Sequence, residues 1–220
     1  MSATTLPGLG RLPSVDIRDS EFPMRAALAP AAQPPMRHTW YAPRALDQGA
    51  TSSCVGHAWA GWLLASPLPN NAGPGPFAIY ADAQQQDEWP GEAYDGTSVR
   101  AGAKVLQAAG LLSTYVWATD AETVADFVLA HAPVVMGTGW FSDMFRPGKG
   151  GLVTPSGRNM GGHAYLCIGY HRARGMFRFL NSWGVGYGQG GRFSMLGEHL
   201  GDLLEQGGEA CAGVELEGQS

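Results

Sequence analysis

Cys54 has the position expected of a catalytic thiol. It follows Ser52 and Ser53, either of which can cap a helix, and it opens an apolar stretch with helical spacing. A cysteine in the first turn of a helix meets free backbone N–H groups and the positive end of the helix dipole, which favour the thiolate. The sequence therefore predicts a nucleophile at Cys54 whose pKa is lowered.

Three further residues would supply a base, its orienting group and an oxyanion donor. His163 starts an apolar strand pattern, and as an imidazolium it would lower the Cys54 pKa and then protonate a leaving amine. Asn181, on the turn after the next strand, would fix the orientation of that ring. The amide of Gln48, six residues before Cys54, would join the Cys54 N–H in donating to an oxyanion. These four residues predict hydrolysis of a peptide bond through an acyl-enzyme.

The surrounding motifs resemble those of the papain-like cysteine peptidases. The resemblance runs from about Val15 to about Met195. The family pattern Gln-Gly-x-x-x-Ser-Cys is matched by Gln48, Gly49, Ser53 and Cys54. The Asn-Ser-Trp-Gly motif, with the aromatic residue and glycines that follow it, is matched by Asn181, Ser182, Trp183, Gly184, Tyr187, Gly188 and Gly191. The opening strand of the family is matched by Val15–Arg18.

The resemblance implies an α+β fold of two lobes, with a helical left lobe, an antiparallel β-barrel-like right lobe and the active-site cleft between them. It implies that Gly96 offers backbone groups to the second substrate residue before the cleaved bond. Thr97, Ala164 and Trp183 would also contact substrate, and Trp183 would shield the His163–Asn181 hydrogen bond from water. A peptide or protein would be the substrate, and neither a metal nor an organic cofactor would be required.

Several positions depart from the family pattern. Val55 replaces the aromatic residue after the nucleophile, and Thr51 replaces a cysteine, so the usual disulfide of the helical lobe cannot form. His163 follows Cys54 by only 109 positions and Asn181 by 127, whereas the family spacing is about 130–150. We therefore expect a compact member of bacterial or viral type, without an inhibitory prosegment before Val15.

Composition narrows the class of protein. The chain has 220 residues, of which 45% are hydrophobic and 15% charged, and its formal net charge is -5. That charge gives no electrostatic support for a nucleic-acid or anionic-membrane partner. Three cysteines are an odd number, which argues against a disulfide framework and for a reducing compartment. The start of the chain does not read as a signal peptide. We expect a cytoplasmic protein, with a virion or leaderless export as alternatives and the oligomeric state open.

Periodicity and turn residues predict helices in the first half of the chain and strands in the second half. Helices are expected over residues 54–64, 77–88, 99–109 and 120–131, and strands over 134–138, 164–170, 176–180 and 192–195. We expect a flexible leader over 1–13, a peptidase domain over 14–196 and an acidic, Gly-rich tail over 197–220. Residues 19–45 are expected to form a long Pro-rich loop without regular structure. Cys167 reads as a core residue and Cys211 as an exposed residue of the tail.

Two other functions remain open on the sequence alone. The chain could keep the fold without turnover, as a binding or structural module of a larger virion or secretion assembly. The Pro-rich loop would favour that hypothesis if it lay across the cleft. Acyl transfer to an amine uses similar residues and would be revealed by an amide product.

Overall fold

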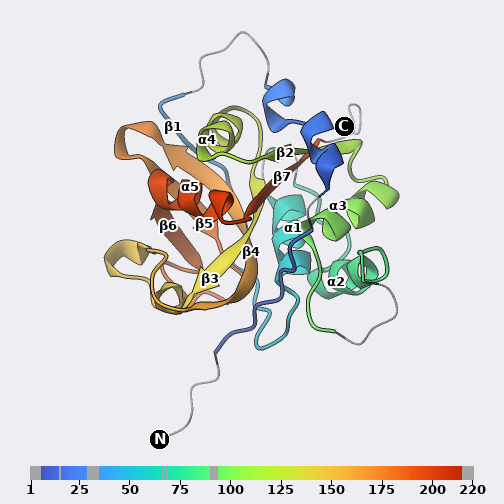
Figure 1. Cartoon of the computed structure of the whole chain (residues 1–220), viewed down its shortest axis with the longest axis horizontal. Coiled ribbons are helices and arrows are strands. Elements are labelled where there is room, and N and C mark those ends of the chain that lie inside the picture. The colour runs from blue at the N-terminus through green and yellow to red at the C-terminus, as the bar shows by residue number, and fades with distance from the viewer. Residues whose placement is uncertain are drawn as a thin grey trace, which may run out of the picture.

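The computed structural model describes residues 6–14, 16–28, 35–65, 67, 69–89 and 94–214. These residues form two lobes, each with its own hydrophobic core. Figure 1 shows α1, α2 and α3 together on one side and the sheet with α4 and α5 on the other. The helices are α1 (Cys54–Leu64), α2 (Pro76–Gln84), α3 (Val99–Ala108), α4 (Ala121–Ala130) and α5 (Gly197–Glu205). The two-lobe α+β fold expected from the resemblance is confirmed.

One antiparallel sheet forms the second lobe. Its order is β2-β7-β3-β4-β5-β6, and β1 pairs with the end of β4. The strands are β1 (Arg37–Thr39), β2 (Thr114–Ala118), β3 (Val134–Phe141), β4 (Asn159–His171), β5 (Met176–Leu180), β6 (Arg192–Leu196) and β7 (Glu209–Val214). In the described part of the chain no helix is long and apolar enough to cross a membrane.

Strand β4 borders both cores, because successive side chains of a strand point to opposite faces. Tyr165 and Cys167 lie in the core of the sheet lobe, whereas Ala164, Leu166 and Ile168 lie in the core of the helical lobe. The strand that carries His163 therefore runs along the boundary between the lobes, directly against α1.

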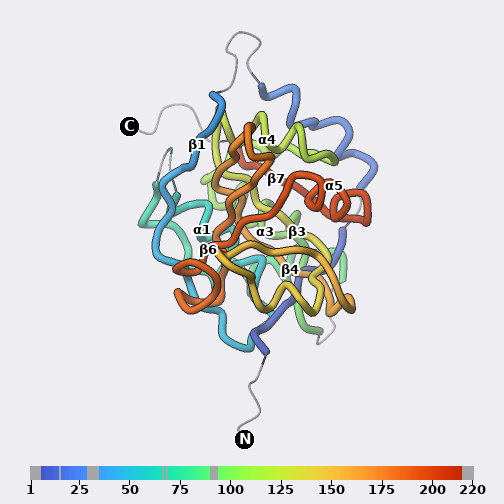
Figure 2. The backbone as a smooth tube through the Cα atoms, turned by 90° about the vertical axis from the view of Figure 1, so that its left-hand side faces the viewer, coloured from blue at the N-terminus to red at the C-terminus, as the bar shows by residue number. Residues whose placement is uncertain are grey.

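The core of the sheet lobe is rich in aromatic side chains. Tyr165 contacts Phe179 and Phe193 edge to face, and Trp140 contacts Tyr165 in the same way. Figures 1 and 2 both place α4 and α5 beside this sheet. Each buried ring removes about 150–250 Å² from water, so this cluster is a major source of stability for the lobe that carries His163 and Asn181.

The expected C-terminal tail is wrong for residues 197–214. These residues form α5 and β7, and β7 pairs with both β2 and β3 inside the sheet. Cys211, expected to be exposed, is fully buried. The segment Glu209–Val214 has few β-branched or aromatic residues, so its pairing partners, rather than its own propensity, make it a strand. Residues 215–220 lie outside the described residues.

The expected opening strand is also wrong in its described part, and Val15 lies outside the described residues. Residues Ile17–Glu21 form a short 3-10 helix, because the Asp16 side chain accepts the Arg18 N–H and caps it. A second such helix covers Met24–Ala27, and β1 follows, so the Pro-rich stretch is not without regular structure. Residues 29–34 of that stretch lie outside the described residues.

The contact between α3 and α1 generates a test of the helical lobe. A Cβ built on Gly102 would lie 2.3 Å from Trp59 Cδ1 and 3.1 Å from Val55 Cγ1. Gly102→Ala should therefore lower the free energy of unfolding by about 1–3 kcal/mol through overpacking. Urea unfolding measures this change. Gly201→Ala in α5, where a Cβ meets nothing within 4 Å, is the matched control, and equal losses for both variants would contradict the close packing.

Candidate active site

The sulfur of Cys54 lies where the two lobes meet. Cys54 is the first residue of α1, follows Ser53 at the N-cap position and is fully buried. Its Sγ accepts a hydrogen bond from the backbone N–H of Ala164 at 3.3 Å. Because Ala164 directly follows His163 in β4, this contact brings the thiol within one residue of the expected base.

The His163 ring is oriented by Asn181. His163 Nε2 lies 2.8 Å from Asn181 Oδ1, and this oxygen also accepts the Ser182 N–H at 2.8 Å. The contact with the Ser182 N–H identifies this atom as the amide oxygen, which can only accept, so His163 Nε2 is the donor. His163 Nδ1 is buried and has no hydrogen-bond partner among the described residues. The ring is therefore held as the Nε2-protonated form, with Nδ1 available to exchange a proton.

Aromatic rings enclose this hydrogen bond. Trp183 stacks on His163 with ring centroids 4.5 Å apart, and Phe145 stacks on Trp183 at 5.3 Å. Trp140 meets His163 edge-on at 4.8 Å. This packing limits the access of water to the histidine–asparagine pair, which is the role that the resemblance implied for Trp183.

Gln48 is held so that its amide N–H groups face backbone carbonyls. Its Oε1 accepts the hydroxyl of Ser182 at 2.6 Å, which fixes the side chain. Its Nε2 donates to Thr51 O at 2.7 Å and to Gly8 O at 3.2 Å. Gln48 is therefore an oriented donor, and one of the carbonyls that it binds belongs to the start of the chain.

Residues 6–14, here called the N-terminal segment, run between the two lobes. Figure 1 shows the segment in dark blue between the sheet and α1 to α3. The Gly8 N–H donates to Gly49 O at 2.9 Å. The Gly8 carbonyl accepts from the Trp183 indole at 3.1 Å as well as from Gln48. The Gly8 carbonyl of the segment thus accepts a hydrogen bond from Gln48 Nε2, the group that was expected to donate to an oxyanion.

The next residues of the segment continue across β4 to Thr97. Gly10 and Arg11 both donate backbone N–H groups to Gly162 O at 3.0 Å. The Thr97 N–H donates to Gly10 O, and the Leu12 N–H donates to Thr97 O, each at 2.9 Å. Arg11 and Thr97 therefore form a parallel bridge, and the segment binds both lobes through its backbone.

Glycine is required where the segment passes the residues that lead to Cys54. A Cβ on Gly8 would lie 1.9 Å from Thr51 O, and one on Gly10 would lie 2.1 Å from Ser52 O. Gly10 also has a φ of 131°, which L side chains rarely adopt. The segment therefore packs with its bare backbone against the chain that leads into α1.

The expectation of a flexible leader over residues 1–13 is therefore wrong from residue 6 onward, and residues 1–5 lie outside the described residues. The stretch has no apolar periodicity, so the pattern that predicts helices and strands did not detect it. The closely spaced Gly8 and Gly10 were the one available signal, because glycine marks close approach of backbones.

Both backbone polar groups of Gly96 are bonded to side chains of α2. The Gly96 N–H donates to the Tyr80 hydroxyl at 3.0 Å, and the Gly96 carbonyl accepts from Gln84 at 3.2 Å. The backbone groups that pair with a peptide in the cleft belong to Thr97. Gly96, with a φ of 103°, provides space instead, because a Cβ there would lie 2.3 Å from Gly10 O.

Burial reverses the expected electrostatics of the thiol and the imidazole. Burial raises the pKa of Cys54 to about 12, although the Ala164 N–H acts in the opposite direction. Burial also lowers the pKa of His163 to about 4, against the hydrogen bond with Asn181. The expected lowering of the Cys54 pKa is wrong for this arrangement, because desolvation exceeds the stabilisation of the thiolate. With the segment in place, both groups are neutral at pH 7.

Comparisons with known proteins identify the fold. No protein-family model and no curated protein matches the chain. Among solved structures, the chain is similar to xylellain, a cysteine protease from Xylella fastidiosa, with 20% identity, a TM-score of 0.74 and coverage of 99% of both chains. It is also similar to digestive procathepsin L 3 of Tenebrio molitor, with 16% identity, a TM-score of 0.69 and coverage of 96% of this chain and 76% of that one.

A cysteine protease of Carica candamarcensis, solved in complex with E-64, is a third match. It has 14% identity and a TM-score of 0.60, and the match covers 82% of this chain and 99% of that one. The chain thus has the fold of papain-like cysteine proteases over nearly its whole length.

The segment generates a labelling test. Gly10→Val should dislodge the segment, since a side chain there collides with the Ser52 carbonyl, and it should expose Cys54. Alkylation of Cys54 by iodoacetamide at pH 7.5 should then rise at least about tenfold, because each unit by which a thiol pKa falls toward the pH raises the thiolate fraction about tenfold. Peptide mass spectrometry gives the rate for each cysteine.

Cys167 and Cys211, both buried in strands, provide internal references that should remain unlabelled. Gly186→Ala, where a Cβ meets nothing within 4 Å, is the matched control variant. Equal Cys54 labelling in the Val variant, the control and the unaltered chain would show that the segment does not limit access.

The neutral His163 generates a test of stability against pH. Its pKa is lowered from 6.5 to about 4 in the folded chain, so the unfolded chain binds an additional proton between these values. This contribution to stability is present above pH 6.5 and is lost as the pH falls toward 4, up to about 3 kcal/mol. Urea unfolding at pH 7, 5.5 and 4 should show a steeper loss for the unaltered chain than for His163→Gln. Parallel curves would contradict a buried neutral ring.

Proposed function

We propose that this chain, which has the papain-like fold, is a thiol-dependent peptidase that cleaves extended peptide segments. The observation that carries the proposal is the oriented His163 ring. Its Nε2 is fixed on Asn181 and its Nδ1 is free, one residue from the amide that binds the Cys54 sulfur. Such a pair can move a proton between a thiol and a leaving group while the third group holds the ring.

Acylation begins when a substrate replaces the N-terminal segment. The lower burial allows the Cys54 proton to pass to His163, and the helix N-terminus stabilises the resulting thiolate. The sulfur forms a bond to the carbonyl carbon, and the oxyanion accepts N–H groups from Gln48 and from the Cys54 backbone. His163 then gives its proton to the amine nitrogen, the carbon–nitrogen bond breaks, and the amine product leaves.

Deacylation uses the same groups in the opposite direction. Water occupies the place of the departed amine, and the now neutral His163 accepts a proton as the water oxygen bonds to the acyl carbon. The carbon–sulfur bond breaks, and the proton returns to the sulfur. The products are the carboxylic acid and the free thiol, so the proposed reaction balances without a metal or an organic cofactor.

The polarity of the N-terminal segment explains why it is not itself cut under this proposal. A substrate places its acyl half toward Thr97 and its leaving amine toward His163 and Trp183. The segment runs the other way, since Gly8 lies at Trp183 and Leu12 at Thr97. A peptide bond in that direction does not offer its nitrogen to His163, so the segment blocks the cleft without being hydrolysed.

A binding module without turnover is the second candidate, and the occupied cleft favours it. In that case the papain-like fold would serve to hold a peptide strand between its lobes, and the segment would fill the site in the absence of a partner. Removal of the segment distinguishes the two functions, because only a peptidase gains turnover.

The decisive measurement is peptide cleavage by the Gly10→Val variant under reducing conditions. We expect hydrolysis of a fluorogenic peptide library well above that of the unaltered chain. Cys54→Ala in the same background should abolish it, and His163→Ala should reduce it by about 10²–10⁴-fold through loss of proton transfer. Rapid Cys54 alkylation without cleavage of any peptide would favour the binding module over the peptidase.

A further inference from the structure

We infer that a hollow in the sheet lobe is a second binding site, which takes a phosphate monoester group between Arg37, Arg174 and Arg178. The inference goes beyond the proposed function, because this site is remote from the thiol. The hollow lies where β1 pairs with the end of β4. His171 at that end is eight residues along the strand from His163, which is about 26 Å at roughly 3.3 Å for each residue.

The basic residues of the chain are concentrated in two stretches. Residues 22–46 and 144–197 contain ten of the 14 lysines and arginines and none of the 19 aspartates and glutamates. The net charge of -5 therefore conceals an uneven distribution of charge. The first stretch contains β1 and the second contains β4, β5 and β6, so strand pairing brings the two acid-free stretches together. The sheet lobe thus has a region of positive potential that attracts anions.

The paired strands form a hollow of about 550 Å³, a volume typical of sites for small ligands. Arg37 is the register partner of His171, and His171 is the register partner of Met176 in β5. Arg178 lies two residues after Met176 and therefore shares a face of the sheet with Arg37. Arg174, from the short 3-10 helix between β4 and β5, also lines the hollow. No carboxylate lines it among the residues that the structure describes.

The three guanidinium groups of the hollow have no ion-pair partner within the described part of the chain. Arg178 Nη1 lies 3.1 Å from Gln189 Oε1 and 3.2 Å from Ser194 Oγ, and both acceptors are neutral. The neighbouring Arg172 is bound to Asp126, which lies outside the hollow. The hollow therefore gathers positive charge that the described residues do not balance.

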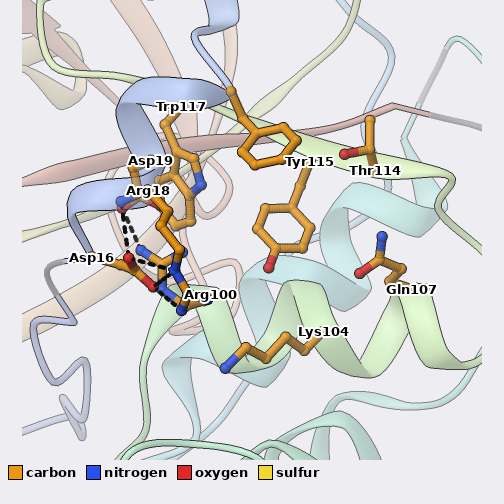
Figure 3. Close-up of a pocket in the computed structure, with 10 residues that line it drawn as sticks. Asp16, Arg18, Asp19, Arg100, Lys104, Gln107, Thr114, Tyr115 and Trp117 are labelled. Carbon is orange, nitrogen blue, oxygen red and sulfur yellow. Dashed lines mark hydrogen bonds and ion pairs between the residues drawn. The ribbon is translucent and has the colours of Figure 1, made fainter.

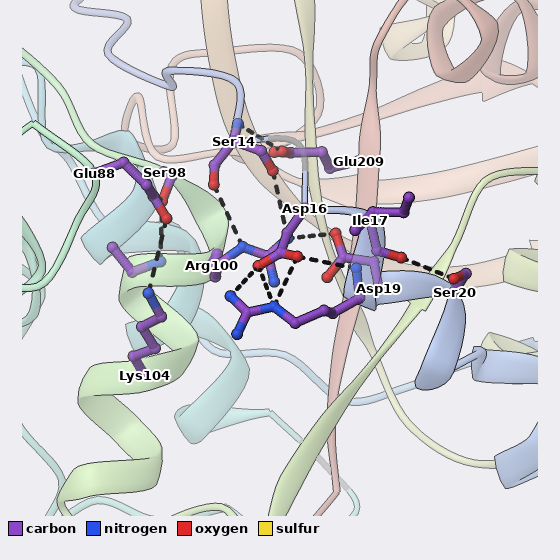
Figure 4. Close-up of polar contacts among 12 residues, drawn as sticks. Ser14, Asp16, Ile17, Asp19, Ser20, Glu88, Ser98, Arg100, Lys104 and Glu209 are labelled. Carbon is purple, nitrogen blue, oxygen red and sulfur yellow. Dashed lines mark hydrogen bonds and ion pairs between the residues drawn. The ribbon is translucent and has the colours of Figure 1, made fainter.

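Arg100 in the helical lobe shows the contrasting arrangement. Figures 3 and 4 show its guanidinium beside the Asp19 carboxylate, with which it forms an ion pair. Burial lowers the pKa of Arg100, but the bond to Asp19 outweighs this effect and the pKa is raised. At Arg178 the direction is reversed, because burial and then the charge of Arg192 lower its pKa. An anion in the hollow would give Arg178 the counter-charge that Arg100 already has.

The arrangement of donors fits a phosphate monoester better than a carboxylate. A phosphate monoester has close to two negative charges and three terminal oxygens, and the planar guanidinium group binds such oxygens in pairs. His171 also lines the hollow, and its buried Nδ1 has no hydrogen-bond partner among the described residues. Unpartnered buried nitrogens are rare in native proteins. A carboxylate, with one charge and two oxygens, would leave most of these donors unused.

Titration of the full, unaltered chain with inorganic phosphate tests the site. Amide NMR spectra, recorded at constant ionic strength with sodium chloride as the balancing salt, should show saturable shifts around residues 37–39 and 169–178. Shifts that are spread over the surface, or that chloride alone reproduces, would overturn the inference. This measurement requires no substitution and no turnover, so its result is independent of the proposed peptidase function.

The matched variants remove equal charge inside and outside the hollow. Arg37→Gln with Arg174→Gln changes two exposed side chains of the hollow. It should weaken phosphate binding at least about tenfold, because charge-assisted hydrogen bonds are lost. Arg146→Gln with Arg158→Gln changes two exposed arginines that do not line the hollow, and it should leave the affinity unchanged. Equal affinities of the two double variants would overturn the inference.

Three peptides that differ at one residue identify the source of the group. The residue is phosphoserine, serine or glutamate, and binding is measured by fluorescence polarisation. Tighter binding of the phosphoserine peptide than of inorganic phosphate would assign the site to a phosphate carried on a peptide. Affinity no greater than that of inorganic phosphate would assign it to free phosphate. Binding of the glutamate peptide as tight as that of the phosphoserine peptide would overturn the inference, because a carboxylate would then suffice.

Discussion

The hydrogen bond from the Ala164 N–H to the Cys54 sulfur is the contact on which the rest of the site depends. It joins the first residue of α1 to the strand that forms the edge of the other core, so the two lobes meet at the thiol. Because β4 faces both cores, its position is fixed from two sides. His163 is therefore placed by packing of the whole molecule, and Asn181 and Trp183 need only set the rotation of its ring.

The same contact is buried, and the N-terminal segment runs beside it with backbone bonds to Gly49, Thr97 and Gly162. Exclusion of water keeps the thiol and the imidazole neutral, which is the opposite of what the helix N-terminus alone would produce. Under the proposed function, the segment acts on the chemistry in two ways. It occupies the place of a substrate, and it excludes solvent that would stabilise the ion pair.

The sequence predicted the bounds of an element correctly where local signals and tertiary packing favour the same structure. The helix Cys54–Leu64 and the strand Met176–Leu180 have the predicted bounds, because the spacing of apolar residues marks both, although Ser53 makes no side-chain cap hydrogen bond at the start of the helix. The strand Glu209–Val214 was missed, since alanine and glycine carry little strand propensity and only its neighbours order it. The N-terminal segment was missed for a related reason: its backbone bonds to residues 49, 97 and 162, and no local pattern encodes such distant partners.

The Arg11–Glu209 pair shows how a segment with few hydrophobic contacts can hold the cleft. Residues 16–28 remain attached to the helical lobe and the sheet through Arg100 and Met24, so the segment is tethered and binds at a high effective concentration. A free peptide that enters the cleft has to replace the backbone bonds of the segment. The hold of the segment on the cleft depends in part on one carboxylate, because Glu209 accepts from both Arg11 and Ser14.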